Sequence, residues 1–353
     1  MIAVGGRKRA FAGAGVRAKS QRLIWAFALL APTITGVVSS LGPAPAAQAQ
    51  TPPAWTSSYI MTTTDPNTLK SDGCSVGKRG VAGYHILDWG RPAYNSSTST
   101  YGVYSTHFGF ASNATVESGT EAWAEGWWGC KANNTAVIFI AMGISNQCLP
   151  DDNSGCAYPV PNGDASLAGY YWGYRVSDFD TWLANQGYGS QEGGAGGYDA
   201  EQQWDPQYAS TKDFEDGYGS ETSLSLADDG TAAPASAWGN SGVWHISWGE
   251  ISAAIPFPEI YGEFGNPSTL ISEWIGDPEY CSGSVCMDVD VWAHGQGLSY
   301  YVYGVTDDYN PSNTGCNGDY TPDQAWTQTL ARIQDNTNTD YQSTIPYLTD
   351  FAC

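Results

Sequence analysis

The chain carries two carboxylates two residues apart, Asp199 and Glu201, in the run GGYDAEQQWDP that spans residues 196–206. Side chains at positions i and i+2 of a strand point from the same face, so a strand here would make the two carboxylates neighbours. Close carboxylates separate their pKa values, which lets one donate a proton while the other stays ionised. Glycoside hydrolysis uses this arrangement. The Asp-x-Glu string recurs at residues 213–215 and 277–279, but only the first copy has small residues before it and polar and aromatic residues after it.

Further carboxylates and tryptophans lie at or near the ends of other predicted strands. Carboxylates can bind sugar hydroxyls, and aromatic rings can pack against the C–H faces of pyranose rings. The 15 Trp and 22 Tyr of this chain exceed what a core requires. The sequence therefore predicts catalytic carboxyl groups at Asp88, Asp199, Glu201 and Glu250, and substrate-binding side chains at Trp89, Trp204, Trp248 and Glu263.

Other kinds of site lack their sequence signatures. The Gly-x-Ser-x-Gly run of a nucleophilic serine is absent, as are a phosphate loop and a dinucleotide fingerprint. The four histidines are scattered and no paired Cys-x-x-Cys spacing occurs, which argues against a zinc site. We interpret His85 and His245 as packing residues, and we expect neither a metal nor a cofactor.

The elements that must position these residues alternate between strands and helices. Short apolar runs predict strands over residues 81–88, 104–110, 136–144, 194–201, 242–248, 258–264 and 298–305. Periodic runs predict helices over residues 116–130, 177–186, 269–275 and 322–334, the last with Thr321 as its N-cap and Pro322 at its first position. Alternating strands and helices indicate βαβ units and an α/β fold, a (β/α)8 TIM-type barrel with an irregularity or a missing strand between residues 205 and 241. An open doubly wound sheet is the alternative. In a barrel, the carboxyl ends of the strands would bring the candidate residues to one mouth.

The first 49 residues have the pattern of a secretory signal. They contain six basic residues and no acidic ones, an apolar stretch over residues 23–38, and Ala47-Gln48-Ala49 as a small-x-small cleavage site. Without them, 36 acidic residues face eight basic ones. A surface this acidic repels nucleic acid and anionic lipid. It suits a neutral polysaccharide, a cationic ligand or Ca²⁺, or it simply keeps the protein soluble. We expect an extracellular monomer, with a signal over residues 1–49, a Thr/Pro-rich strap over 50–80 and a single barrel domain over 81–353.

Eight cysteines in an exported chain predict four disulfides. The short intervals favour Cys148–Cys156 and Cys281–Cys286 as loop staples. Cys74–Cys130 and Cys316–Cys353 are the expected long-range pairs.

The strand-borne Asp-x-Glu, the early strand that ends in Asp88 and the later run VWHISWG at residues 243–249 together resemble the family 25 glycoside hydrolases, the Chalaropsis-type muramidases. They are also similar to the glycoside hydrolase-like barrels of secreted bacterial proteins. The resemblance spans about residues 81–335. It implies Glu201 as the general acid, Asp199 as the adjacent stabilising carboxylate and Asp88 as the acid of the first strand.

Two functions follow from the sequence as hypotheses. The first is a secreted hydrolase that cleaves a polysaccharide or cell-wall glycan by carboxylate acid/base catalysis. The second is a non-catalytic barrel that binds such a glycan through its aromatic residues. A third and weaker hypothesis is an extracellular protein stabilised by Ca²⁺.

Overall fold

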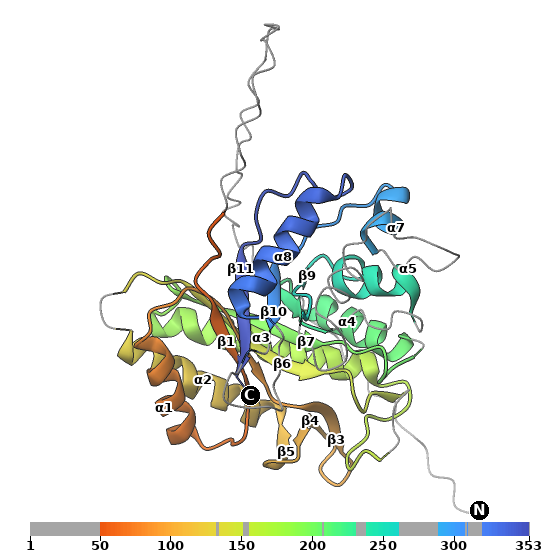
Figure 1. Ribbon diagram of the computed structural model, residues 1–353. Coiled ribbons are helices and arrows are strands. Elements are labelled where there is room, and N and C mark those ends of the chain that lie inside the picture. The colour runs from red at the N-terminus through yellow and green to blue at the C-terminus, as the bar shows by residue number, and fades with distance from the viewer. Residues whose placement is uncertain are drawn as a thin grey trace, which may run out of the picture. The chain divides into compact units, whose positions relative to one another are not determined.

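The computed structural model describes residues 50–131, 134–150, 155–206, 208–230, 238–260, 289–307, 309 and 320–352. Its centre is a nearly closed barrel of eight parallel strands (Figure 1). The strands are β1 (Thr56–Ile60), β2 (Gly83–Asp88), β6 (Ile138–Ser145), β7 (Glu192–Asp199), β8 (Leu226–Asp228), β9 (Ala254–Pro256), β10 (Gly304–Asp307) and β11 (Tyr347–Ala352).

The order of the strands around the barrel follows their order in the chain, and the last strand, β11, pairs with β1. Closure between β9 and β10 rests on the bridge from Glu259 to Thr306. There the Thr306 N–H donates to the Pro258 carbonyl at 3.0 Å and the Ile260 N–H donates to the Thr306 carbonyl at 2.8 Å. The predicted α/β class is confirmed.

At least one described helix lies in each connection between consecutive barrel strands. Figure 1 shows α1 and α2 on one side of the strands and α4, α5 and α7 on the other. The helices are α1 (Pro66–Gly77), α2 (Asn113–Cys130), α3 (Ala165–Gln186), α4 (Ala209–Glu221), α5 (Gly239–Trp244), the π-helix η2 (His245–Gly249), α7 (Val289–Gly295) and α8 (Pro322–Asp335). A small antiparallel sheet of β3 (Arg91–Asn95), β4 (Thr100–Ser105) and β5 (Gly109–Ser112) is inserted between β2 and α2.

Two hydrophobic layers hold the barrel together. The inner layer is small and consists of Tyr84, Ile86, Ala141, Ala195, Ala227 and Phe257. The outer layer fills the space between strands and helices, and it includes the fully buried Trp123 and Trp127 of α2. These two tryptophans lie four residues apart, so they fall on the same helix face and pack toward the strands.

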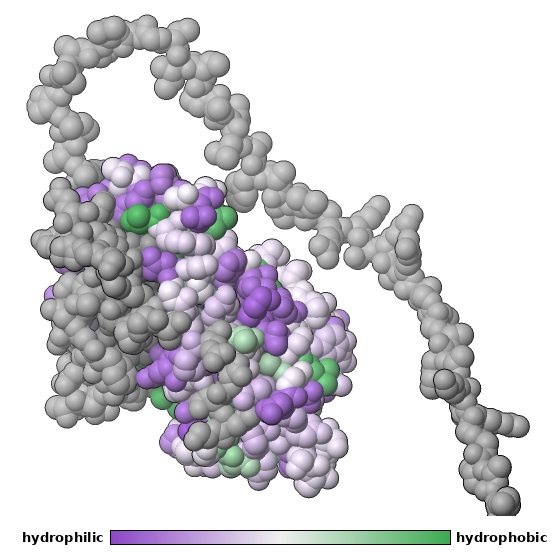
Figure 2. All heavy atoms as spheres, turned by 90° about the vertical axis from the view of Figure 1, so that its right-hand side faces the viewer, coloured by the Kyte–Doolittle hydropathy of each residue, from purple (hydrophilic) through white to green (hydrophobic). Residues whose placement is uncertain are grey.

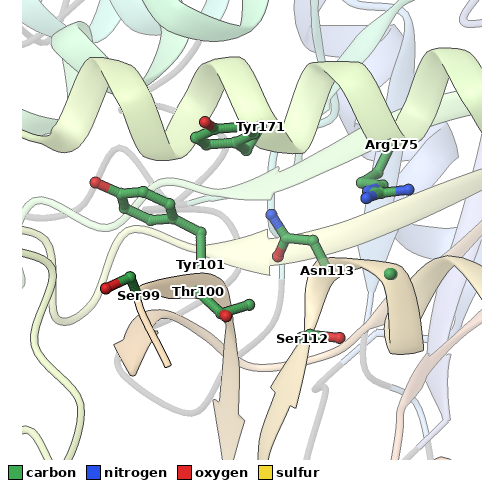
Figure 3. Close-up of a pocket in the computed structure, with 8 residues that line it drawn as sticks. Ser99, Thr100, Tyr101, Ser112, Asn113, Tyr171 and Arg175 are labelled. Atoms are coloured by element: carbon green, nitrogen blue, oxygen red, sulfur yellow. The ribbon is translucent and has the colours of Figure 1, made fainter. Parts of the chain in front are cut away.

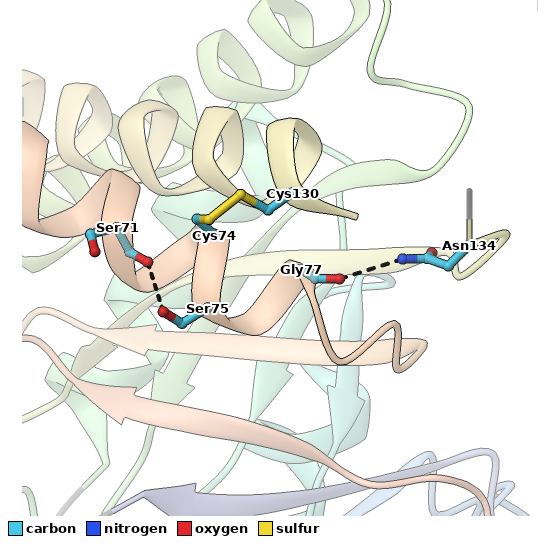
Figure 4. Close-up of a disulfide and its surroundings, with 6 residues drawn as sticks. All are labelled: Ser71, Cys74, Ser75, Gly77, Cys130 and Asn134. Atoms are coloured by element: carbon cyan, nitrogen blue, oxygen red, sulfur yellow. Dashed lines mark hydrogen bonds between the residues drawn. A yellow bond between two sulfur atoms is a disulfide. The ribbon is translucent and has the colours of Figure 1, made fainter. Parts of the chain in front are cut away.

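The first two helices pack with their backbones in close approach. A Cβ atom at Gly126 of α2 would lie only 2.0 Å from the Lys70 carbonyl oxygen of α1, so that only glycine fits there. A disulfide joins Cys74 of α1 to Cys130 at the end of α2 (Figure 4). This pair and Cys148–Cys156 confirm two of the four predicted disulfides. The other two predicted pairs lie outside the described residues.

Several predicted elements are correct. The predicted strands 81–88, 136–144 and 194–201 correspond to β2, β6 and β7, and the predicted helices 116–130 and 322–334 correspond to α2 and α8. Thr321 caps α8 through a reciprocal capping box with Gln324. The strand missing between residues 205 and 241 is β8, and α3 begins twelve residues before the predicted 177–186.

Other predicted elements are wrong. Residues 242–248 are helical, in α5 and η2, because their buried residues Gly242, Val243, Ile246 and Ser247 recur at helical spacing. Residues 104–110 lie in the β4–β5 hairpin rather than in the barrel, and the strand predicted at 298–305 starts only at Gly304. Residues 50–80 supply β1 and α1 to the barrel instead of a strap. The predicted helix 269–275 and residues 261–264 lie outside the described residues.

Among the described residues, few large apolar side chains are exposed. On the face in Figure 2, the coloured residues are mostly hydrophilic or intermediate, with small separate apolar patches. The helix α3 is an exception, because it exposes several large apolar side chains. Each of these is about two-fifths exposed: Leu167, Tyr170, Tyr171 and Tyr174. Among the helices in the described ranges, none is long and apolar enough to cross a bilayer.

Candidate active site

Four carboxylates continue the inward-facing rows of the barrel at the carboxyl ends of its strands. Asp88 lies two residues after Ile86 on β2, and Asp199 lies four residues after Ala195 on β7. Asp229 follows Ala227 of β8 at the same spacing of two, as Glu259 follows Phe257 after β9. Because side chains alternate along a strand, all four carboxylates point into the barrel mouth.

Glu201, two residues after Asp199, adds a fifth carboxylate to these four, and the closest group among the five consists of Asp199, Glu201 and Glu259. Each of the three offers one carboxylate oxygen, and these oxygens all lie within 4.8 Å of one another. Glu201 and Glu259 are buried, with 6% and 4% of their surfaces exposed. The prediction that Asp199 and Glu201 are neighbours is therefore confirmed, and Glu259 joins them.

Asn146, directly after β6, fixes the segment that carries Asp199 and Glu201. Its side-chain amide donates to the Glu201 carbonyl at 2.9 Å, and its side-chain oxygen accepts from the Glu201 N–H at 3.0 Å. Its backbone N–H donates to the Asp199 carbonyl at 3.1 Å. A completely buried side chain with these reciprocal bonds holds Glu201 in one position beyond the end of its strand.

The hydrogen-bond network of Asn146 extends to α4. Its amide also donates to the Thr211 hydroxyl at 3.0 Å, and that hydroxyl donates to Asp205 at 2.8 Å. Asp205 accepts a second bond from the Thr211 N–H at 2.8 Å. On the other side of the turn, the Gln202 side chain accepts from the Trp238 N–H at 3.2 Å. The loop from Glu201 to Asp205 is thus tied to β6, α4 and residue 238.

The electrostatics of the cluster favour protonated carboxyl groups. Burial raises the pKa of Asp199 well above its usual range, and the nearby Glu201 and Asp229 raise it further. Burial also raises the pKa of Asp229 well above its usual range, and the nearby charges of Asp228 and Asp88 raise it further. The pKa of Asp88 is raised to about 6 by burial, against the opposing effect of the Gly90 N–H that donates to it at 2.8 Å.

Within the described residues, Asp199 and Asp229 form no ion pair with a basic side chain. The Oδ1 atoms of both are buried without a hydrogen-bond partner there. Such a cluster needs either shared protons or a cation. Asp199, Glu201 and Glu259 are the residues whose oxygens are close enough to ligate a cation, and oxygen ligands of this kind suit Ca²⁺ or Mg²⁺.

The structure brings together three of the four predicted catalytic residues. The charges of Asp88 and Glu201 both act on Asp199, which places Asp88 in the same cluster. Glu250 follows the π-helix η2 instead of a strand, and it forms an ion pair with Lys212 of α4 at 2.7 Å. Its predicted place at a strand end is therefore wrong, because the segment before it is helical.

The predicted substrate-binding residues have different surroundings. Trp89 is completely buried and packs near Phe108, so it belongs to the core. Trp248 lies on η2, stacks on Tyr300 at 4.5 Å and donates to the Tyr301 carbonyl at 2.8 Å. Trp204 is half-buried in the turn after Glu201. Glu263 lies outside the described residues.

The site residues predicted from the sequence do not include Asn146, Asp229 or Glu259. Asn146 follows a strand that was predicted correctly, so its place at a strand end was the available signal. Asp229 follows a strand of three residues, which is too short to give an alternating pattern. Glu259 was missed because the strand was predicted at residues 258–264, which places Glu259 inside the strand. The strand in fact ends before Glu259, at residues 254–256.

His85 is a packing residue, as predicted. Its side chain is completely buried on β2, its Nδ1 lies 3.3 Å from the Ser57 carbonyl, and its ring packs against Trp123. Burial lowers the pKa of His85 to about 3, so the ring is neutral.

No known protein family and no curated protein sequence matches this chain.

Proposed function

We propose that the protein is a secreted glycoside hydrolase with a (β/α)8 barrel of the TIM type, which cleaves a polysaccharide or cell-wall glycan. The observation that carries the proposal is the trio of carboxylate oxygens of Asp199, Glu201 and Glu259 within 4.8 Å at the barrel mouth. Active sites of such barrels form at the carboxyl ends of the strands. The strand order that follows the chain order supports the TIM type. The leader pattern and two disulfides support secretion.

The proposed mechanism uses one protonated and one ionised carboxyl group. Glu201, held by Asn146 and buried beside other acids, is the general acid that protonates the leaving oxygen. Burial raises the pKa of Asp199 well above its usual range, which favours its protonated form. Glu259 is then the ionised carboxylate that faces the positive charge developing on the sugar ring.

The spacing of the carboxylates points to a particular stereochemical course. Retaining glycosidases hold their two carboxyl groups about 5–5.5 Å apart, whereas inverting enzymes leave about 6.5–9.5 Å for a water molecule. Carboxylate oxygens within 4.8 Å of one another are compatible with the shorter spacing. We therefore propose retention of configuration, with Glu259 as the nucleophile.

The test is a release assay with the protein from residue 50 onward against a panel of polysaccharides and isolated cell walls. We expect release of reducing ends from at least one neutral polymer or cell wall, with the same rate in the presence of EDTA. No release from any substrate would contradict the hydrolase and leave the glycan-binding barrel. Loss of activity in EDTA, or a melting temperature that rises with added Ca²⁺, would assign the carboxylates to a cation instead.

A further inference from the structure

A pocket outside the barrel lies between the β3–β5 sheet and α3 (Figure 3). Its volume is about 290 Å³, near the lower end of the range of about 300–1,000 Å³ for small-molecule sites. The pocket therefore suits one ring-sized unit. Its walls come from Thr100 and Tyr101 of β4, Ser112 and Asn113 at the start of α2, and Tyr171 and Arg175 of α3.

Asn113 supplies the observation that points to a ligand. Asn113 is only 6% exposed, yet its side-chain oxygen has no hydrogen-bond partner among the described residues. Figure 3 shows its amide between the two tyrosines and Arg175. A buried carboxamide oxygen without a partner is energetically unfavourable. A ligand hydroxyl that donates to this oxygen would remove that cost.

The two tyrosines form a fixed aromatic wall beside Asn113. The rings of Tyr101 and Tyr171 stack with centroids 5.3 Å apart and an interplanar angle of 26°. The Tyr101 hydroxyl donates to Asp164 at 2.8 Å, which holds its ring in place. Tyr171 is 43% exposed, and Tyr170 and Tyr174 extend the aromatic surface along α3. Rigid, half-exposed tyrosines are surfaces on which the C–H face of a sugar can pack.

The charges around the pocket favour a neutral ligand. Arg175 forms ion pairs with Glu117 at 2.8 Å and Asp178 at 3.7 Å, so its charge is already balanced and does not attract an anion. The nearby Asp164 carboxylate is engaged by Tyr101. What remains toward the pocket is a set of uncharged hydroxyl and amide groups together with the N–H donors of Arg175.

We propose that this pocket binds a single neutral sugar residue, at a site separate from the barrel carboxylates. The aromatic wall takes the C–H face of the ring, and Asn113 and Arg175 bind its hydroxyls. The site uses none of the residues assigned to hydrolysis, so it stands whether or not the barrel cleaves glycans.

The test is binding of the methyl glycosides of glucose, galactose, mannose and N-acetylglucosamine, measured by saturation-transfer NMR and titration with protein produced without N-linked glycosylation. We expect at least one glycoside to bind. Asn113→Ala should weaken it by about 2- to 10-fold, the range for loss of one polar contact. Tyr171→Ala removes part of the aromatic wall and should weaken binding as well. The matched control Tyr303→Ala, a similarly exposed tyrosine on the segment before β10, should bind like the native protein.

Binding to Glu201→Gln separates this proposal from the hydrolase. The pocket predicts unchanged affinity in Glu201→Gln, even if that variant has lost all activity. The proposal is overturned if none of the four glycosides binds or if both pocket variants bind normally. It is also overturned if Glu201→Gln abolishes binding, or if inorganic phosphate binds at Arg175 in place of the sugars. Circular dichroism of each variant confirms that it is folded.

Discussion

At the scale of single residues, the site depends on how the Asn146 side-chain amide holds the loop that begins at Glu201. Asp199 and Glu201 were predictable from their spacing alone, because alternation along a strand fixes the face of each side chain. Their partner Glu259 and their support Asn146 come from other strands, at sequence distances that no local pattern reports. The sequence indicates which residues can do chemistry, while the barrel decides which of them meet.

Asn146→Ala should lower both stability and turnover. The substitution leaves the Glu201 N–H and carbonyl without their partners, at a cost of about 1–3 kcal/mol for each buried group. A shift of Glu201 out of line can reduce kcat by up to about 10²-fold. Denaturant unfolding and separate kcat and KM values check both effects.

The matched control lies at the other end of the same strand. Asn134 precedes β6, and its side chain also bonds to backbone groups, donating to the Lys131 carbonyl at 2.6 Å and accepting from the Ala136 N–H at 3.0 Å. Asn134→Ala should lower stability and leave kcat unchanged. Equal kcat in the two variants would show that Asn146 has no positioning role.

At the scale of elements, sequence patterns identified the long and periodic pieces. The helix α2 was predictable because its buried residues recur at helical spacing. The buried strand β6 was predictable because it is a continuous apolar run. The strand β1 was not predictable, because its buried residues Thr56, Ser57 and Ser58 are polar. Ser58 and Thr349 pair their hydroxyls at 3.1 Å inside the barrel, a contact between the two ends of the domain.

The packing of α1 on α2 gives a sharp prediction about two glycines of one helix. Gly126→Ala should destabilise the fold by about 1–3 kcal/mol, since its Cβ would lie 2.0 Å from the Lys70 carbonyl oxygen and must force the helices apart. Gly129 is exposed and has no atom within 4 Å of such a Cβ. Gly129→Ala should therefore be neutral or stabilise by up to about 1 kcal/mol. Equal unfolding free energies for the two variants would contradict the close approach.

At the scale of the whole molecule, an acidic protein buries many of its carboxyl groups. Burial raises the pKa of Asp228 to about 6 and that of Glu192 to about 8. A carboxyl group with a raised pKa in the folded state stabilises the fold below its unfolded pKa, near 4, and this stabilisation is lost as the pH rises through the folded value. The folded protein should therefore be more stable at pH 4 than at pH 8.

Asp228→Asn isolates one part of this effect. Asp228 is 2% exposed, faces the helix layer, and accepts from the Ser247 hydroxyl and from the Gly230 N–H at 3.3 Å. Asparagine keeps an acceptor but cannot ionise. From pH 4 to pH 8, the unfolding free energy of the variant relative to the native protein should rise by about 3 kcal/mol, from a pKa shift of about two units. Denaturant unfolding at both pH values measures the shift, and a constant difference would rule it out.

The central claim is that Glu201, and not Glu250, performs general acid catalysis at the barrel mouth. The most direct measurement is kcat/KM of the native protein, Glu201→Gln and Glu250→Gln on the best substrate of the release assay. Glutamine keeps the shape of Glu201 but has no acidic proton, so we expect a loss of about 10²–10⁴-fold with an unchanged melting temperature. Glu250→Gln removes only the ion pair with Lys212 and should retain activity within about twofold. Normal activity in Glu201→Gln, or an equal loss in Glu250→Gln, would contradict the account.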